Sequence, residues 1–413
     1  MYGAQTFAIR RVQHNVRSRS LVKRFEGIAL GVFAVLAILI AGGFKHTPYN
    51  NFVLLADAFR HGRTWIDWPG AYIDALPYNG RYYVIEAPLP AVLLLPALAI
   101  WGTATNQTAL AALLGGVATF AAYEIARMLE VPRRTSAFVA AFLLLGTDLF
   151  WCAMLGDVWF IAHVASAAMT LLAIRELLGK RRGVLVALYA AAAVESRFTM
   201  VLVLPVYAAL LWWGTGAGAL LARERSPRDH RRNFIAYAFT LVPFVALWIG
   251  YNEARWGVPY DIGYTAWYHQ DSAGEPTGSP FRLSYIPYEL HSFFLRLPDF
   301  QAGYPYVVPT LNGFALTWSS PGLVLGLFAR GPMRLRIAMW AAVALCFLPN
   351  VVYYVNGYAQ FGMRHALDFE PFLFVLIALA CRDGIGRIGI ALCGYSMLVG
   401  AWGCWYWRTF VRT

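Results

Sequence analysis

The chain has 413 residues, of which 59% are hydrophobic and 14% are charged, and its mean hydropathy is +0.52. A soluble domain of this composition would lack the polar surface that water requires, so the composition excludes a soluble globular protein and indicates a membrane protein. The net charge of +12 does not indicate nucleic-acid binding, because the lysines and arginines form short clusters between apolar stretches, where they orient spanning helices.

The first apolar run, residues 27–44, follows a basic segment. This charge favours a cytoplasmic start, and no small-residue cleavage site follows the run, so we expect an uncleaved first span. The five cysteines show no CxxC spacing and are expected to be structural.

Residues 88–101 form an apolar stretch that contains Pro88, Pro90 and Pro96. If the later basic clusters are cytoplasmic, the span at 107–127 runs inward, and a first span that runs outward leaves no crossing for 88–101. We therefore expect this stretch to lie at the outer membrane surface or to dip into it. The alternative is a true span with one basic loop outside.

The remaining spans are predicted from apolar runs and from basic clusters that are expected on the cytoplasmic side. The clusters lie at 127–134, 180–182, 223–232, 330–336 and 382–387. The spans after the one at 107–127 are predicted at 135–153, 158–177, 183–195, 198–214, 234–251, 313–329, 336–354, 369–381 and 389–407. The chain is thus predicted to be an all-α polytopic protein of about eleven transmembrane helices in the inner (plasma) membrane, with its C-terminus outside.

Two long polar segments fall on the outer side of this topology. They are 45–106, which includes juxtamembrane helices, and 252–312. No fixed-period repeat appears, and neither segment is long enough to fold alone, so we expect a single transmembrane domain over 1–413.

The first outer segment is rich in acids, arginines and aromatic residues. Glu86 directly precedes the proline-punctuated helix at the membrane edge, where an unpartnered carboxylate pays a desolvation cost. A cation, a proton or a substrate is therefore the expected partner of Glu86. The other acids and aromatic residues equally fit a solvated loop with an interfacial belt.

Several short motifs resemble the GT-C superfamily of polytopic glycosyltransferases, which includes the lipid A aminoarabinose transferases and protein O-mannosyltransferases. The motifs are Glu86-Ala87-Pro88-Leu89-Pro90 with Asp74 upstream, Gly156-Asp157-Val158, Glu195-Ser196-Arg197-Phe198 with Leu204-Pro205, and the segment 360–368. The chain departs from that family after the first span, where Lys45-His46-Thr47 replaces an Asp-Glu pair.

The resemblance implies transfer of a sugar from a polyprenyl-phosphate donor to an acceptor hydroxyl at the outer (periplasmic) face, with inversion. The catalytic carboxylates would be Asp74, Glu86 and Asp157, and Asp74 is preferred as the base over Asp57 and Asp67 because Gly70 and Pro77 bracket it in a turn-prone segment.

Arginine suits a donor phosphate, because its planar fork binds phosphate through two hydrogen bonds. Arg81, Arg197 and Arg364 are predicted near the outer boundary. Arg197 could instead pair with Glu195, and Arg364 with Asp368 one helical turn away. Tyr82, Tyr83 and Tyr264 are the predicted sugar-binding or acceptor-binding residues.

His163 lies inside an apolar helix, six residues after Asp157. It could bind a divalent metal together with Glu86, but a hydrogen-bonded packing role is favoured, so metal use is left open. The predicted partners are a polyprenyl-phosphate-linked sugar, a lipid, glycan or protein acceptor, and membrane lipids, without nucleic acid. The alternatives are a transporter or flippase and a non-catalytic membrane subunit.

Overall fold

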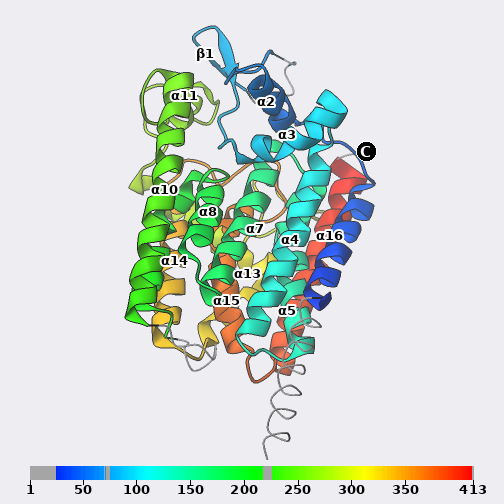
Figure 1. Ribbon diagram of the computed structural model, residues 1–413. Helices are drawn as coiled ribbons and strands as arrows, with labels where there is room; N and C mark the ends of the chain where they lie inside the picture. Colours follow the sequence, from blue (N-terminus) through cyan, green and yellow to red (C-terminus); the bar gives the residue numbers. More distant parts are fainter. Residues whose placement is uncertain (1–24, 69, 71–74, 217–225, 412–413) are drawn as a thin grey trace, which may run out of the picture.

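A computed structural model of the chain describes residues 25–68, 70, 75–216 and 226–411 (Figure 1). The regular structure in this part is helical apart from two short antiparallel hairpins, β1–β2 (Leu76–Tyr78 and Arg81–Tyr83) and β3–β4 (Asp299–Phe300 and Val307–Val308). Lipid cannot hydrogen-bond to backbone groups, so helices that pair those groups internally are the expected solution. The prediction of an all-α polytopic membrane protein is confirmed.

Six helices in the described part are long and apolar enough to cross a membrane. They are Phe25–Gly42, α4 (Gln107–Met128), α7 (Val158–Leu178), α10 (Pro227–Trp256), α14 (Met333–Val351) and Arg387–Val411, which combines α16 (Arg387–Tyr406) with a π-helical turn. The pair α5 (Arg133–Leu145) and α6 (Leu149–Leu155), bent by 54°, can form a seventh span.

Shorter apolar helices occupy most of the other predicted spans. They are α8 (Gly183–Val194), η2 (Phe198–Val203) with α9 (Leu204–Trp213), η4 (Pro321–Phe328) and α15 (Glu370–Ala380). The predicted positions therefore hold helices, but their lengths do not confirm a count of about eleven spans.

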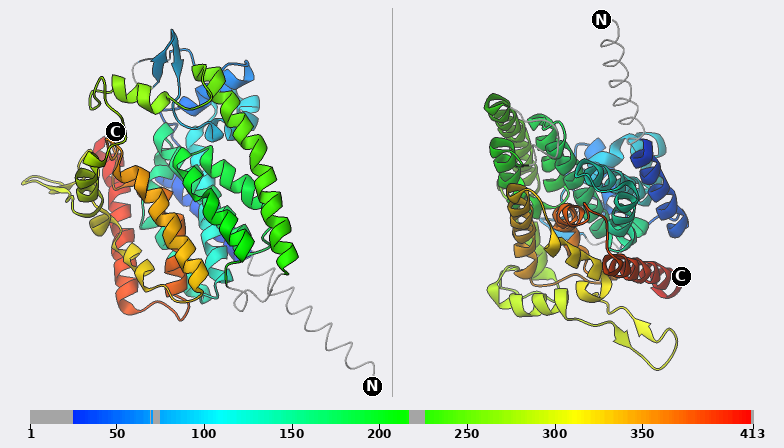
Figure 2. Two further views of the ribbon diagram at one scale, coloured as in Figure 1. Left: turned by 90° about the vertical axis from the view of Figure 1, so that its left-hand side faces the viewer. Right: turned by 90° about the horizontal axis from the view of Figure 1, so that it is seen from below.

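The connections that carry the basic clusters lie at one end of the helix bundle, which is the lower end in Figure 1. Helices α4 and α5, α7 and α8, and α15 and α16 are joined there. The helix Phe25–Gly42 also starts at this end, whereas α16 ends at the opposite one (Figures 1 and 2). The two ends of the described chain thus lie at opposite ends of the bundle, as the predicted topology requires.

The opposite end, called the outer end below, carries α2 (Asn51–Arg60), β1–β2, α3 (Leu89–Trp101) and α11 (Gly263–Gln270) (Figure 1). Helix α3 packs against α2 and does not run along the bundle. Helix α3 therefore lies across this end of the bundle, and the location of residues 88–101 at the outer membrane surface stays a prediction. The outer end also carries α12 (Ile286–Phe294) and the β3–β4 hairpin, which projects from the side of the molecule (Figure 2).

The first helix packs closely against α4 through glycines. A Cβ added to Gly31 would lie 2.9 Å from the carbonyl oxygen of Gly116, and a Cβ added to Gly116 would lie 2.3 Å from Cγ2 of Val35. Gly27 and Gly31 are four residues apart and face α4 in the same way. Such small-residue spacing lets two helix backbones approach within the membrane, where the hydrophobic effect does not drive helix association.

This close approach predicts that Gly116→Val destabilises the protein by about 1–3 kcal/mol, because the new side chain collides with the backbone of the first helix. Thermal unfolding in detergent would measure the loss. The matched control is Gly250→Val, since a Cβ added to Gly250 in α10 meets nothing within 4 Å. Equal melting temperatures for the two variants would contradict the packing described here.

Glu289 is a buried acid in the second outer segment. Its side chain on α12 is 0% exposed, and neither carboxylate oxygen has a hydrogen-bond partner. Burial raises the pKa of Glu289 to about 8, although Arg296 opposes this shift. A raised pKa in the folded state means that the folded protein holds a proton that the unfolded chain has already released.

The pH dependence of stability follows from this proton. The contribution of Glu289 is fully present below the unfolded pKa of about 4.5 and is lost as the pH rises through 8. We expect Glu289→Gln, which keeps the shape and removes the charge, to melt at a higher temperature than the unmodified protein at pH 9 and at a similar temperature at pH 5. A temperature difference that does not change with pH would contradict the assignment.

Candidate functional site

A cavity of about 1220 Å³ lies at the outer end of the bundle. Its walls come from the end of the first helix, the junction of α6 and α7, the segment after α8, helix α11, the segment 349–365 and the end of α16. Five residues predicted for the site line it: Glu86, Asp157, Arg197, Tyr264 and Arg364. His163, the predicted alternative metal ligand, lines it too.

Asp368 is the centre of a buried polar network beneath this cavity. Its carboxylate accepts hydrogen bonds from Nε of Arg197 at 3.2 Å and from Nη2 of Arg197 at 3.0 Å, which is a bidentate pair. Thr199 Oγ1 donates to the same carboxylate at 3.1 Å, and Nδ1 of His163 lies 3.2 Å from it. Asp368 is 0% exposed, so this set of partners replaces water completely.

The electrostatics of the pair follow from this geometry. Burial alone would raise the pKa of Asp368, but Arg197 and His163 hold it well below its usual range. Both members of the pair therefore stay charged at neutral pH.

Two of the pairings predicted as alternatives are wrong. Arg197 pairs with Asp368 rather than with Glu195. Asp368 therefore pairs with Arg197 and not with Arg364, as the second alternative had it. Arg364 starts the short helix η5 (Arg364–Asp368), and its guanidinium donates to the carbonyl oxygen of Tyr358 rather than to Asp368. The two arginines are thus in different electrostatic situations.

Arg364 is a buried arginine whose donors are only partly used. Its Nη1 donates to the carbonyl oxygen of Tyr358 at 3.1 Å, whereas its Nε has no hydrogen-bond partner. The guanidinium carbon lies 5.3 Å from the centre of the Phe160 ring. Burial lowers the pKa of Arg364 to about 10, which leaves it cationic at neutral pH. Arg364 therefore places a cation in the wall of the cavity.

Asp157 reaches the cavity from the residue just before α7. Its carboxylate accepts a hydrogen bond from Thr47 Oγ1, and Asp157 is 1% exposed. The amide of Val158 donates to the carbonyl oxygen of Tyr49 at 3.2 Å, so the segment after the first helix is fixed to the start of α7. The segment that lacks the family's Asp-Glu pair thus supplies Thr47, which holds Asp157.

Glu86 reaches the cavity from the segment before α3. It is 6% exposed, as expected for an acid at the membrane edge. Its charge acts on Arg364 and on Tyr264, so the three groups share one electrostatic environment. The amide of Leu89 donates to the carbonyl oxygen of Glu195 at 2.8 Å, which ties this segment to the end of α8.

Three of the predicted residues lie outside the cavity walls. The guanidinium of Arg81 stacks 3.6 Å above the Trp65 ring. The Tyr82 ring lies 4.8 Å from that of Trp68, and the buried Tyr83 ring lies 4.9 Å from that of Trp256. These residues build the outer β1–β2 hairpin rather than the cavity. Asp74, the preferred base, lies outside the described residues.

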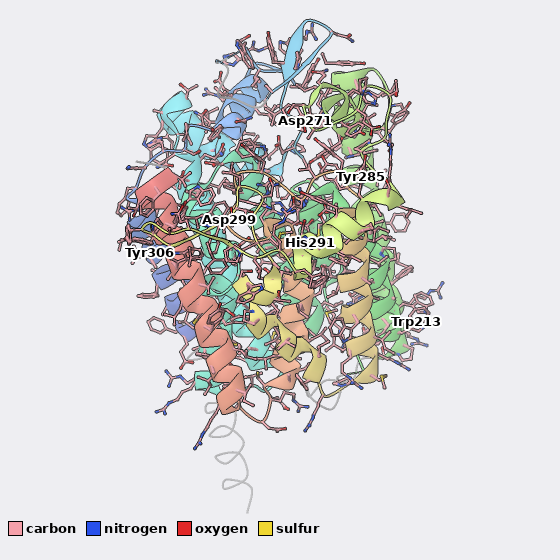
Figure 3. All side chains as sticks on the ribbon, turned by 180° about the vertical axis from the view of Figure 1, so that it is seen from behind. Trp213, Asp271, Tyr285, His291, Asp299 and Tyr306 are labelled. Atoms are coloured by element: carbon pink, nitrogen blue, oxygen red, sulfur yellow. The ribbon has the colours of Figure 1, made fainter. Side chains whose placement is uncertain are left out.

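Part of the cavity wall is aromatic. Tyr264 and Trp267 of α11 line it together with Tyr353 and Tyr354, and the rings of Tyr264 and Tyr353 are 6.4 Å apart. The hydroxyl of Tyr354 donates a hydrogen bond to the carboxylate of Asp271, which is labelled in Figure 3 at the outer end. Sequence reasoning found Tyr264 but missed the two adjacent tyrosines, whose only signal was their place at the outer end of a predicted span.

His163 makes the hydrogen bond expected of a buried histidine in a helix bundle, because its Nδ1 contacts Asp368. Within the described ranges, no group of three or more His, Cys, Asp or Glu side chains is placed to hold a metal ion. A metal site at Glu86 and His163 stays an untested hypothesis.

The Arg197–Asp368 pair predicts a non-additive effect of substitutions on stability. Removing one partner leaves the other charge buried without compensation, so Arg197→Met and Asp368→Asn should each cost about 3–5 kcal/mol. The double substitution should cost less than the sum of the two, and Arg197→Lys should lose only part of the stability, because lysine keeps the charge but lacks the bidentate fork.

The measurement is thermal unfolding in detergent of the single and double variants. The exposed pair Arg63–Asp67, with an N–O distance of 3.1 Å, is the control, and its substitutions should change stability by less than about 1 kcal/mol. Additive losses at Arg197 and Asp368 would show that the buried pair is not coupled.

Comparison with protein-family models and with curated proteins finds no match for this sequence. Among solved structures, the chain is similar to ArnT from Cupriavidus metallidurans bound to undecaprenyl phosphate, with a TM-score of 0.52 and 14% sequence identity. The similarity covers 91% of this chain and 62% of the ArnT chain. The chain therefore shares the overall fold of the ArnT structure and spans less than two thirds of the length of the ArnT chain.

Proposed function

We propose that the protein is a membrane glycosyltransferase of the GT-C type that transfers a sugar from a polyprenyl-phosphate donor to an acceptor hydroxyl. The observation that carries this proposal is the convergence of Glu86, Asp157 and Arg364 on one cavity at the outer end of the bundle. The fold shared with ArnT, which was solved with undecaprenyl phosphate, supports the choice of donor.

The proposal places the basic end of the bundle in the cytoplasm and the cavity at the outer face of the inner membrane. The positive-inside rule supports this orientation, since the basic clusters gather at the end away from the cavity. The N-terminus is then cytoplasmic and the C-terminus outside.

Arg364 is the group that we assign to the donor phosphate. A phosphate at the membrane edge enters a region of reduced dielectric, where it needs a nearby cation. Arg364 lines the cavity and forms no ion pair with any other described residue, whereas two donors of Arg197 are already used by Asp368. Arg197 then holds the floor of the site in place through its pair with Asp368. Arg81 has no part in this assignment.

The carboxylates supply the acid–base chemistry. The acceptor oxygen attacks the anomeric carbon while the bond from that carbon to the phosphate oxygen breaks, and the phosphate leaves on the opposite face, so the configuration inverts. Glu86 or Asp157 takes the proton of the acceptor hydroxyl, and Arg364 stabilises the charge that develops on the leaving phosphate. Asp74 stays a further candidate for the base.

The aromatic wall is assigned to the sugar. Tyr264, Trp267 and Tyr353 present flat apolar surfaces and hydroxyl or indole groups to the cavity, which suits the apolar faces and hydroxyl rims of a pyranose. Tyr82 and Tyr83 belong to the hairpin and are not part of this wall.

The proposal is tested by transfer from a panel of undecaprenyl-phosphate sugars to membrane acceptors. We expect Glu86→Gln or Asp157→Asn, whichever removes the base, to lower the transfer rate about 10²–10⁴-fold while donor binding persists. Arg364→Ala should weaken donor use strongly, and Arg364→Lys should restore it in part, because lysine supplies charge without the planar fork. Arg81→Ala is the control and should keep full activity.

Two outcomes would overturn the proposal. If the transfer rate is unchanged in all three of the Glu86, Asp157 and Arg364 variants, the reaction does not take place in this cavity. Movement of the intact lipid-linked sugar across the membrane, without transfer in the unmodified protein, would instead assign the protein as a flippase.

A further inference from the structure

The cavity does not end at the carboxylates but continues to a gap between two helices. Gly42 and Lys45 line it from the end of the first helix, and Trp407, Arg408 and Val411 line it from the end of the α16 segment. The two helices run side by side along one flank of the bundle (Figures 1 and 2). A Cβ added to Gly43 would lie 3.7 Å from Nη2 of Arg408, so their outer ends are close. We call this gap the crevice.

The helices on both sides of the crevice present apolar surfaces outward. Phe33, Leu36 and Ile40 of the first helix are at least half exposed, and Leu398 of α16 is 72% exposed. Apolar side chains that are exposed on spanning helices face lipid. A hydrocarbon chain at this flank therefore meets exposed apolar side chains on both helices.

Two cations stand at that mouth. Lys45 and Arg408 are both exposed and both line the cavity. Within the described part of the chain, no hydrogen bond or ion pair joins either side chain to another residue. This contrasts with Arg197, whose charge is neutralised by Asp368. Two uncompensated positive charges beside exposed apolar side chains favour an anion that carries a hydrocarbon tail.

Aromatic residues place these cations at the level of the lipid headgroups. The β3–β4 hairpin lies over the end of α16, where the Tyr304 ring is 6.3 Å from that of Trp405 and 6.0 Å from that of Phe410. Tyr306, labelled in Figure 3, lies beside the same end. Tyr304, Trp405 and Phe410 are 66%, 41% and 41% exposed. Exposed tyrosine and tryptophan side chains gather at the interface between membrane and water.

We propose that a polyprenyl phosphate passes laterally between the first helix and α16, and that Lys45 and Arg408 bind its phosphate at the mouth of the cavity. This inference rests on the proposed function. The lipid tail stays in the crevice while the phosphate moves between the two outer cations and Arg364, whose guanidinium lies against Phe160 farther inside. No bond forms or breaks in this step.

The two positive charges of Lys45 and Arg408 favour a polyprenyl phosphate over bulk phospholipid. A phosphate monoester carries about −1.5 to −2 charges at pH 7, so two cations neutralise the phosphate that remains after sugar transfer. A phospholipid such as phosphatidylglycerol is a diester with one negative charge and has two acyl chains. A single slim tail suits a gap between two helices better than a pair of chains does.

The test measures binding of undecaprenyl phosphate to the purified full-length protein in detergent by native mass spectrometry. We expect the Lys45→Glu/Arg408→Glu variant to bind this lipid at least about tenfold more weakly than the unmodified protein, because charge reversal replaces attraction by repulsion. The Lys45→Gln/Arg408→Gln variant should fall between them. The control Arg63→Glu changes a charge at the outer end away from the cavity walls and should bind normally. Melting temperatures confirm that each variant is folded.

Two competitors separate the possible sources of the anion. Inorganic phosphate and phosphatidylglycerol should each displace undecaprenyl phosphate poorly. Effective displacement by phosphatidylglycerol would show that the mouth of the cavity binds anionic lipids in general. Effective displacement by inorganic phosphate would show that the lipid tail does not contribute to binding. Either result overturns the inference, as does equal affinity in the folded double variant. Failure of the unmodified protein to bind undecaprenyl phosphate would instead overturn the proposed function.

Discussion

The buried carboxylate of Asp368 is the constraint on which the functional end of the molecule depends. A charge at this depth is tolerated only if polar partners replace its hydration shell, and these partners come from separate elements. Arg197 and Thr199 follow α8, and His163 belongs to α7. Satisfying one carboxylate therefore fixes η5, which carries Asp368, against two other segments, and the floor of the cavity is built from these three.

Because Asp368 pairs with Arg197, the two arginines of the site have different roles. Arg197 is paired with Asp368 and holds the surrounding segments together, whereas Arg364, at the other end of η5 from Asp368, lines the cavity. The carboxylates follow a similar division. Glu86 and Asp157 line the cavity, while Glu289 is buried in the outer segment away from it. Proximity in sequence is a poor guide to which charged residues act together.

Local physics made much of the fold predictable. Apolar runs and basic clusters gave the positions of the helices and the end at which the polar segments gather, because lipid imposes the same requirement on every span. The burial of Glu86 followed from its position before an apolar helix. The Arg197–Asp368 pair could not be found in this way, because it joins residues 171 positions apart and a plausible local partner, Glu195, stood nearby. Arg81, Tyr82 and Tyr83 were misplaced for a related reason: their stacking partners decide that they build the hairpin.

The long sequence separation within the Arg197–Asp368 pair has a consequence for biogenesis. A chain inserted from its N-terminus places Arg197 at the membrane edge long before residue 368 has been synthesised. During that interval the guanidinium must be solvated by water or by lipid headgroups, since its carboxylate partner does not yet exist. Helices α7 and α8 can therefore associate early, but the floor of the cavity closes only when the last third of the chain reaches the membrane. A nascent chain that stalls before this point would hold most of its spans but would lack the carboxylate that closes the floor of the cavity.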